Sequence, residues 1–254
     1  MELNLLPHRV AGAAENMAVD FLLLQRYPQP AHARFRHYGW RGPAVTFGYS
    51  QKLAWVREQL GPVDGIELCR RVTGGGIVDH QEDWTYALVL PRGHPAEELR
   101  AAHSYRLVHE ALAAALVEQG VRALVKPCAA DECVAEPLVA AGGRVGQTGI
   151  KDAMGGICFQ RAEVFDVVIE QTGAKIAGAA QKRNKHGLLL QGSVARRVAG
   201  GDTIDWERFQ DCFVAGLSAA LDVPAVPTPW PEFREEEVEM LTQQYASPEW
   251  TGYR

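Results

Sequence analysis

Segments with the alternating pattern of β-strands recur along this chain with helical segments between them, and this order constrains the fold more than any other feature. Helical periodicity covers five segments: 13–27, 53–60, 95–119, 206–221 and 235–245. Strand patterns cover seven: two within 33–49, separated by a turn at Gly42–Pro43, and then 66–71, 85–90, 164–169, 175–181 and 187–194. We therefore expect one α/β (α+β) domain over 1–254, with a mixed β-sheet packed with helices.

Composition excludes several classes of partner. The chain has 254 residues, of which 47% are hydrophobic and 22% charged, so it is long enough to bury a sizeable core. Its formal net charge of −5 offers no overall positive field for nucleic acid or anionic lipid. The N-terminus lacks a signal-peptide pattern, and no segment has the roughly 20 apolar residues of a membrane span. We expect a cytoplasmic protein that binds neither nucleic acid nor membrane.

The segment from Arg70 to His80 contains the first candidate site. It reads RRVTGGGIVDH, with two arginines ahead of three consecutive glycines. Glycines leave backbone N–H groups unshielded, and arginines supply positive charge. The segment is therefore suited to binding a carboxylate, carbonyl or phosphate group. The alternative is a flexible turn with surface arginines, because glycine runs are common in turns. His80 is either a substrate-orienting or basic residue, or a structural histidine.

Two further residues carry reactive groups. Lys175 opens a strand of small and apolar residues, where a fixed ammonium can stabilise negative charge in a transition state. Cys158 lies between the glycine segment and that strand, and a thiolate is the usual nucleophile for an acyl thioester. The alternatives are a solvated lysine and an inert buried cysteine. Cys128 and Cys133 lack the further ligands of a zinc site, so we expect no metal.

These segments, taken together and in this order, resemble the lipoate-protein ligase A and octanoyltransferase family. Residues 70–80 are similar to its Arg-Arg-x-x-Gly-Gly-x-x-Val-x-His signature, and 175–181 to its Lys-Ile-x-Gly-x-Ala-Gln signature. Residues 187–194 are similar to its Leu-x-x-Gly-Ser strand. The resemblance implies the catalytic-domain fold of the biotin/lipoate protein ligase superfamily, with no separate C-terminal accessory domain in this chain.

The resemblance also implies roles for individual residues. The glycine segment and Lys175 would line a narrow tunnel for an eight-carbon chain, with Lys175 on the acyl carbonyl or activated phosphate. Cys158 matches the position of the nucleophile in one octanoyltransferase branch. The expected substrate-binding residues are Arg70, Arg71, Thr73, Gly74, Gly75, Gly76, Ile77, His80, Gly178, Ala179 and Gln181.

Three activities stay open at this point. An octanoyltransferase would take the acyl group from acyl carrier protein through a Cys158 acyl-enzyme, without a cofactor, and pass it to a lysine of a lipoyl-domain or glycine-cleavage H-type protein. A lipoate-protein ligase would adenylate lipoate or octanoate with ATP and Mg²⁺, and Gly76 makes the loop similar to that branch. A non-catalytic lipoate- or carrier-binding module would retain the pocket but have no catalytic activity. The transferase is the favoured interpretation.

Overall fold

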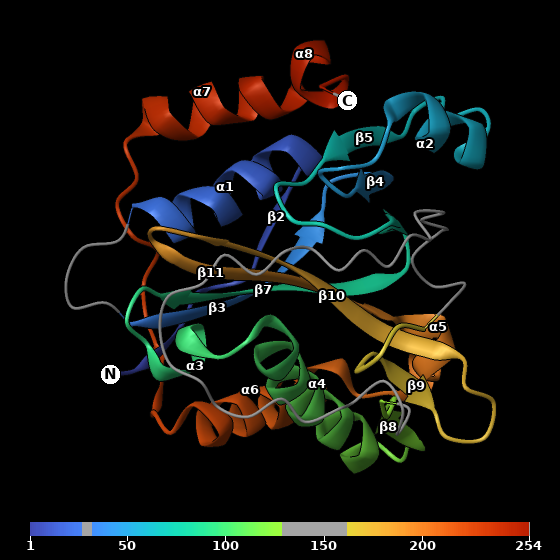
Figure 1. Ribbon diagram of the computed structural model, residues 1–254, viewed down its shortest axis with the longest axis vertical. Coiled ribbons are helices and arrows are strands. Elements are labelled where there is room, and N and C mark those ends of the chain that lie inside the picture. The colour runs from blue at the N-terminus through green and yellow to red at the C-terminus, as the bar shows by residue number, and fades with distance from the viewer. Residues whose placement is uncertain (27–31, 129–161, 254) are drawn as a thin grey trace.

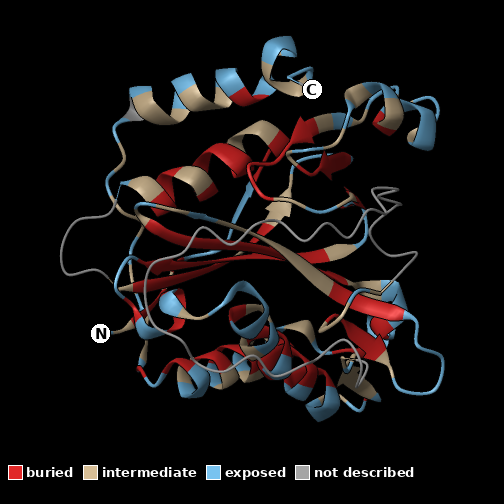
Figure 2. Ribbon diagram, in the orientation of Figure 1, coloured by how far each residue is buried: buried red, intermediate tan, exposed pale blue. Residues whose placement is uncertain are grey.

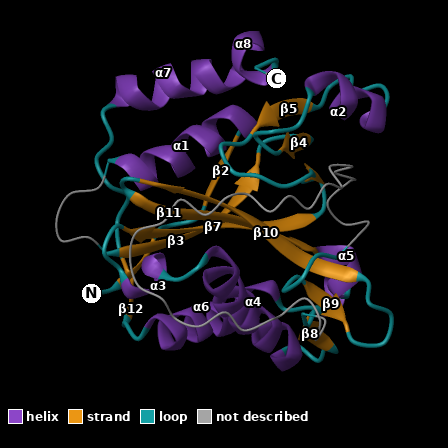
Figure 3. Cartoon of the chain, viewed as in Figure 1, coloured by secondary structure: helices purple, strands orange, loops and turns teal. Residues whose placement is uncertain are grey.

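A mixed β-sheet runs through the centre of the molecule with helices on both faces (Figures 1 and 3). The computed structural model describes residues 1–26, 32–128 and 162–253. In these residues the large sheet has nine strands: β1 (Leu3–Leu5), β2 (Arg9–Ala11), β3 (Ala33–Trp40), β7 (Asp83–Pro91), β8 (Ala123–Val125), β9 (Val167–Ile169), β10 (Lys175–Asn184), β11 (Gly187–Ala195) and β12 (Ala225–Pro227). The expected mixed sheet packed with helices is confirmed.

The strand order explains why the sheet is mixed. The main path runs β12-β1-β3-β7-β11-β10-β9-β8, and β2 pairs with the far end of β3. Pairing is parallel among β12, β1, β2 and β3, and antiparallel from β3 through β7, β11, β10 and β9 to β8. A second sheet, in the order β5-β4-β6, contains β4 (Ala44–Phe47), β5 (Glu67–Arg70) and β6 (Ile77–Asp79).

Helices cover the two faces of the large sheet, and each face has its own core. The helices are α1 (Ala13–Gln25), α2 (Leu53–Leu60), α3 (Pro95–Glu98), α4 (Ala101–Glu118), α5 (Arg196–Ala199), α6 (Trp206–Leu221), α7 (Glu235–Ala246) and α8 (Pro248–Thr251), with a 3₁₀ turn at Gly201–Thr203. α4 and α6 pack below the sheet in Figure 1, whereas α1 and α7 lie above it. Figure 2 shows buried central strands and exposed outer helix faces.

Side-chain alternation assigns the central strands to these two cores. On β7, Trp84, Tyr86 and Leu88 face α4 and α6, whereas Ala87 and Val89 face α1. The same period of two holds along β11, because successive strand residues point to opposite faces. A strand of this kind can therefore present polar residues to a cavity on one face while its other face stays apolar.

The prediction of one helix over 95–119 is wrong, because the segment forms α3 and α4 with a break between them. Leu99 and Arg100 have extended backbones, with ψ of 150° and 147°. The carbonyl of Leu99 accepts a hydrogen bond from the Arg183 guanidinium at 2.8 Å. A tertiary contact thus occupies the carbonyl that a continuous helix would have used.

The other expected elements are present with small shifts of their ends. The first helix ends at Gln25, and the strand expected over 164–169 begins at Val167. The loop expected over 127–156 lies almost wholly outside the described residues. No helix in the described part of the chain has the length and apolar character needed to cross a membrane.

Candidate active site

A cavity lies between the α1 face of the large sheet and the glycine segment that joins β5 to β6. Part of it is open to solvent, and both apolar and polar side chains line it. Gly75 and Lys175 both line it, although they are far apart in the sequence. The site residues expected from the sequence that meet here are Arg71, Gly75, His80, Lys175, Gly178 and Ala179.

The glycine segment is held in a tight conformation against β4. Gly75 has a φ of 87°, which favours glycine, and a Cβ atom on Gly48 would lie 2.0 Å from the Gly75 carbonyl oxygen. The Arg71 guanidinium donates to the carbonyls of Gly74 and Gly76, at 3.0 Å each. Arg71 therefore fixes the loop from the inside and brings a positive charge to the cavity wall.

Arg70 points away from the cavity and is fully buried. Its guanidinium donates to four backbone carbonyls, those of Tyr49, Gln51, Trp250 and Thr251, at 2.6 to 3.1 Å. The Trp250 indole N–H returns a hydrogen bond to the Arg70 carbonyl at 2.9 Å. These contacts tie helix α8 to the segment between β4 and α2.

Lys175 points toward the cavity because of a β-bulge. The pairing of β10 with β9 shifts register between Lys175 and Ala177, and such an irregularity re-aims a side chain. Ile176 and Ala177 pack in the core beneath the sheet, while the Lys175 ammonium lies 2.8 Å from the Asp166 carboxylate. A Cβ atom on Gly178 would lie 2.6 Å from the Lys175 Nζ. Because Gly178 has no side chain, the Lys175 ammonium has room beside it.

The Asp166 carboxylate accepts several hydrogen bonds, which hold it in place and so orient the Lys175 ammonium that it pairs with. It accepts hydrogen bonds from the Tyr105 hydroxyl and, at 2.7 Å, from the Glu163 backbone N–H. Burial, and then the neighbouring Asp166 charge, hold the pKa of Tyr105 well above its usual value, so Tyr105 keeps its proton and donates it. The Tyr105 oxygen in turn accepts from the Ala179 N–H at 3.0 Å. The ammonium is therefore held between α4, β9 and β10.

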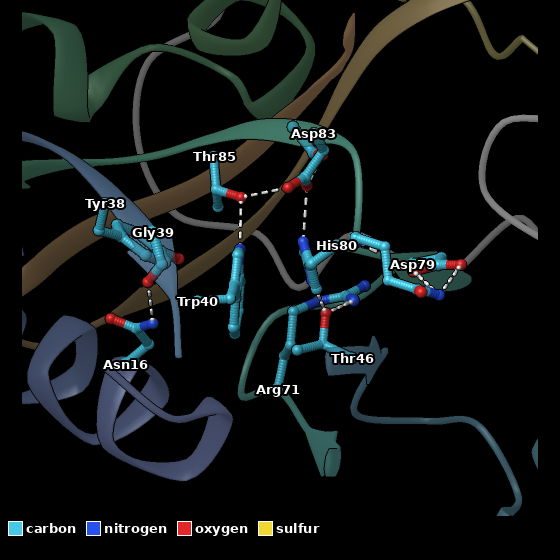
Figure 4. A network of polar contacts seen from close by, with 12 residues as sticks. Asn16, Tyr38, Gly39, Trp40, Thr46, Arg71, Asp79, His80, Asp83 and Thr85 are labelled. Carbon is cyan, nitrogen blue, oxygen red and sulfur yellow. Dashed lines mark hydrogen bonds and ion pairs between the residues drawn. The ribbon is translucent and has the colours of Figure 1, made fainter. Parts of the chain in front are cut away.

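His80 joins a chain of buried polar groups on the opposite wall, shown in Figure 4. Its Nδ1 lies 2.6 Å from the Asp83 carboxylate, and its Nε2 lies 2.7 Å from the Thr46 hydroxyl. Its ring stacks on Trp40 with 4.0 Å between centroids. The contact between His80 and Asp83 spans the turn that links the small sheet to β7, so this pair fixes the two sheets relative to one another.

Further polar residues connect the glycine segment to helix α1. The Thr73 hydroxyl donates to the Gln191 amide oxygen at 2.7 Å, and the Gln191 amide nitrogen donates to Asp20 at 2.7 Å. Asp20 also accepts from Arg36 at 2.7 Å and from the Tyr38 hydroxyl at 3.1 Å. Buried charges are retained when they are paired and hydrogen-bonded in this way.

The other expected site residues lie near the cavity without lining it. Gly74 and Gly76 hold Arg71, Thr73 bonds to Gln191, and Ile77 belongs to the core of the small sheet. The Gln181 side chain donates to the Ala101 carbonyl at 2.7 Å, at the start of α4. Cys158 lies outside the described residues.

Sequence reasoning missed the cavity residues that come from helix α1 and from other strands. Polar or sulfur-bearing lining residues of this kind are Met17, Tyr38, Thr46, Thr85, Gln191 and Ser193. Two signals were available: Gln191 and Ser193 recur at a spacing of two on an otherwise apolar strand, and Asp166 is a lone acid within the apolar segment 164–169. Among the described residues, no three His, Cys, Asp or Glu side chains gather as metal ligands.

Comparison with known proteins gives a consistent result. A family model described as the lipoyl protein ligase A/B catalytic domain matches residues 12–215. The chain is 27% identical to an octanoyltransferase LipM of Macrococcus caseolyticus, covering 94% of each chain, and 28% identical to one of Symbiobacterium thermophilum, covering 93% of each. Its fold is similar to that of a bi-partite lipoate protein ligase of Thermoplasma acidophilum, solved in work on that ligase and its E2 lipoyl domain, with a TM-score of 0.67 at 19% identity over 100% of this chain and 98% of that one.

Proposed function

Because the chain belongs to the lipoyl protein ligase A/B catalytic domain family, we propose that it is an octanoyltransferase of protein lipoylation. The donor is an octanoyl thioester of acyl carrier protein, and the acceptor is a lysine of a lipoyl-domain or H-type protein. One observation carries the proposal: Gly75 and Lys175 line the same cavity. The names of the two relatives favour transfer over ligation.

The cavity is suited both to the hydrocarbon chain of an acyl group and to its carbonyl group. Met17, Val78, Ala179 and Ala180 give it an apolar wall for a hydrocarbon chain. The Lys175 ammonium, held by Asp166, is placed to stabilise the oxygen of a thioester carbonyl as it gains negative charge. A preorganised donor of this kind is worth more in a buried site than in water, because no solvent has to reorganise around the charge.

The reaction then has two steps. The Cys158 thiolate attacks the carbonyl carbon of the carrier thioester, and the carrier thiolate leaves with its electron pair. The amine of the acceptor lysine next attacks the octanoyl-Cys158 thioester, and the cysteine thiolate is regenerated. The role of Cys158 rests on its place between the glycine segment and Lys175, as in one octanoyltransferase branch.

Intact-mass measurement tests this function. We expect an octanoyl adduct after incubation with octanoyl carrier protein, lost in Cys158→Ser because an alkoxide is not available at neutral pH. Cys212→Ser is the matched control, since Cys212 lies on α6, on the side of the sheet away from the cavity. An adduct that persists in Cys158→Ser, or wild-type protein that never becomes acylated, would rule out this mechanism.

A ligase is the second candidate, favoured by the third glycine, Gly76, and by the fold it shares with a lipoate protein ligase. That activity requires ATP and Mg²⁺ and releases pyrophosphate. Pyrophosphate release that depends on lipoate, without an acyl adduct on the protein, would establish the ligase. Binding of octanoate or lipoate with neither signal would identify a non-catalytic module.

A further inference from the structure

The floor of the cavity contains a row of residues that crosses four neighbouring strands of the large sheet. These residues pair in register from β10 through β11 and β7 to β3, and they are Gly178, Ser193, Thr85 and Tyr38. All four line the cavity. The Lys175 ammonium lies beside Gly178, at one end of the row. Tyr38 lies at the other end, so the row leads from a positive charge to an aromatic ring.

The first three positions of the row carry a small side chain or none, and their hydroxyl groups are already hydrogen-bonded. The Ser193 hydroxyl and the Thr85 hydroxyl both donate to Asp83, the latter at 2.9 Å. Thr85 also accepts a hydrogen bond from the Trp40 indole N–H at 2.9 Å, and Figure 4 shows both contacts of Thr85. A buried polar group that has its partners does not need water. A hydrocarbon chain can therefore lie along this row without leaving a polar group unpaired.

Tyr38 is the first large side chain of the row, and residues that do not line the cavity hold its ring in place. Its hydroxyl donates to Asp20 at 3.1 Å, and Asp20 forms an ion pair with Arg36 at 2.7 Å. The Arg36 guanidinium also lies over the Tyr38 ring, 3.9 Å from its centroid. All three side chains are almost completely buried. The ring cannot turn aside without breaking these contacts, so it forms a rigid end wall.

The length of the row matches an acyl chain of eight carbons. Adjacent strands lie about 4.8 Å apart, so the row spans about 14 Å from Gly178 to Tyr38. An extended octanoyl chain measures about 9 Å from its carbonyl carbon to its terminal carbon at standard bond lengths and angles. Non-bonded carbon atoms approach to about 4 Å. With the carbonyl group next to the Lys175 ammonium, the terminal methyl group therefore reaches the Tyr38 ring. A chain with two more carbons needs about 2.5 Å more.

We propose that Tyr38 is a specificity-determining residue that limits the acyl chain to eight carbons. This inference rests on the proposed octanoyltransferase function, which places the acyl carbonyl group at Lys175. A longer chain would have to displace the ring and break its contacts with Asp20 and Arg36. A shorter chain would leave the space in front of the ring unfilled and lose apolar contact. Tyr38 acts on the end of the chain and does not touch the reacting atoms.

Carrier proteins loaded with acyl chains of six, eight, ten and twelve carbons test the proposal. The kcat/KM of acyl transfer to a lipoyl domain is measured for each chain, and the ratio of octanoyl to decanoyl is the result that decides. This ratio does not depend on the fraction of active protein, so a loss of stability cannot imitate a change in it. We expect wild-type protein to prefer octanoyl by at least about 20-fold, because one or two methylene groups in an apolar pocket change kcat/KM by this order.

Three substitutions assign the limit to the ring of Tyr38. Tyr38→Leu removes the ring, and we expect the ratio to fall to about threefold or less. Tyr38→Phe keeps the ring without the hydroxyl and should keep the wild-type ratio. Tyr245→Leu is the matched control, because Tyr245 is a buried tyrosine of the same core that does not line the cavity. Its ratio should equal that of the wild type.

Tyr38→Met is the second variant, for the case that Tyr38→Leu does not fold. A methionine fills the core with a flexible side chain that can move aside for a longer acyl chain. We expect its octanoyl-to-decanoyl ratio to fall to about fivefold or less.

Equal use of octanoyl and decanoyl by the wild type would overturn the proposal. A wild-type ratio in Tyr38→Leu and Tyr38→Met would overturn it as well, and so would an equal fall in Tyr245→Leu. Wild-type protein that transfers no acyl group of any length would instead contradict the proposed function. Calorimetry with free octanoate and decanoate then tests the wall by itself, and equal affinity for the two acids, or no binding of either, would overturn it.

Discussion

At the scale of single residues, the position of the Lys175 ammonium depends on the lack of a side chain at Gly178. Lys175 lies over Gly178, three residues further along the same strand, where a methyl group would fall within 2.6 Å of both Cε and Nζ. Asp166 holds the charge from the other side. The two glycine-containing motifs were recognisable in the sequence, yet the partners of Lys175 were not. Asp166 and Tyr105 reach it through the pairing of β9 with β10 and the packing of α4, which no local pattern reveals.

Gly178→Ala tests this dependence directly. The added methyl displaces the ammonium, so we expect the transfer rate to fall by about 100-fold, the usual effect of losing one preorganised donor. The free energy of unfolding, measured with urea, should change by less than about 1 kcal/mol, since the end of a flexible side chain can move aside.

Gly42→Ala is the matched control for this substitution. Nothing lies within 4 Å of the position of its added Cβ atom, and Gly42 is not among the glycines with positive φ. Its transfer rate should equal that of the wild type. A wild-type rate in Gly178→Ala would show that the site does not need the lysine in this position.

At the scale of elements, hydrophobic periodicity predicted most of the long helices and strands, because their burial follows a regular period. The strands β1, β2, β6, β8 and β12 were missed, since three residues are too few to show a period. The break between α3 and α4 depends on a hydrogen bond from Arg183, on a distant strand. Helix α4 also positions the site, because His109 Nδ1 lies 2.6 Å from the carbonyl of Phe165, directly before Asp166.

His109 makes stability depend on pH. Burial lowers its pKa from 6.5 to about 4, so the folded protein keeps the ring uncharged in a range where the unfolded chain takes up a proton. Between these two values the unfolded state binds more protons, and stability falls as the pH is lowered. We expect this histidine to contribute about 1.4 kcal/mol per pH unit to that fall.

Urea unfolding at pH values from about 7 to about 5 measures the slope. His109→Gln, which retains a hydrogen-bond donor, should lose the contribution of one proton to the slope. His103→Gln, at an exposed position on the same helix, should retain the full slope. Equal slopes in all three proteins would show that His109 takes up its proton as readily in the folded state as in the unfolded state, and would contradict the lowered pKa.

At the scale of the whole molecule, a buried arginine connects the end of the described chain to the base of the glycine segment. Arg70 was expected to bind substrate, because its neighbour in sequence is Arg71 and the family signature contains both. In the fold, Arg70 ends β5 and Arg71 directly follows it, and successive side chains of an extended chain point to opposite faces. The Arg71 guanidinium therefore lines the cavity, while the Arg70 guanidinium donates to carbonyls of α8. The sequence alone does not show which of the two arginines points into the cavity.

Arg70→Lys should therefore reduce stability more than substrate binding. A lysine has three donors on one atom and cannot reach four carbonyls at once, so we expect a loss of about 2 to 4 kcal/mol in the free energy of unfolding. Arg57→Lys, on an exposed face of α2, is the control and should be neutral. A raised KM for the octanoyl donor with unchanged stability would instead establish Arg70 as a substrate-binding residue.

The site is divided between two sheets, with Thr46 and Arg71 belonging to the small sheet or its edge and Asp83, Ser193 and Lys175 to the large one. Heating that loosens the three short strands would separate these groups by a few ångströms while most of the backbone stays folded. Enzymatic activity should therefore disappear at a lower temperature than the far-ultraviolet circular dichroism signal. The difference between the two midpoint temperatures would measure how much less stable the packing of the small sheet against the large sheet is than the rest of the fold.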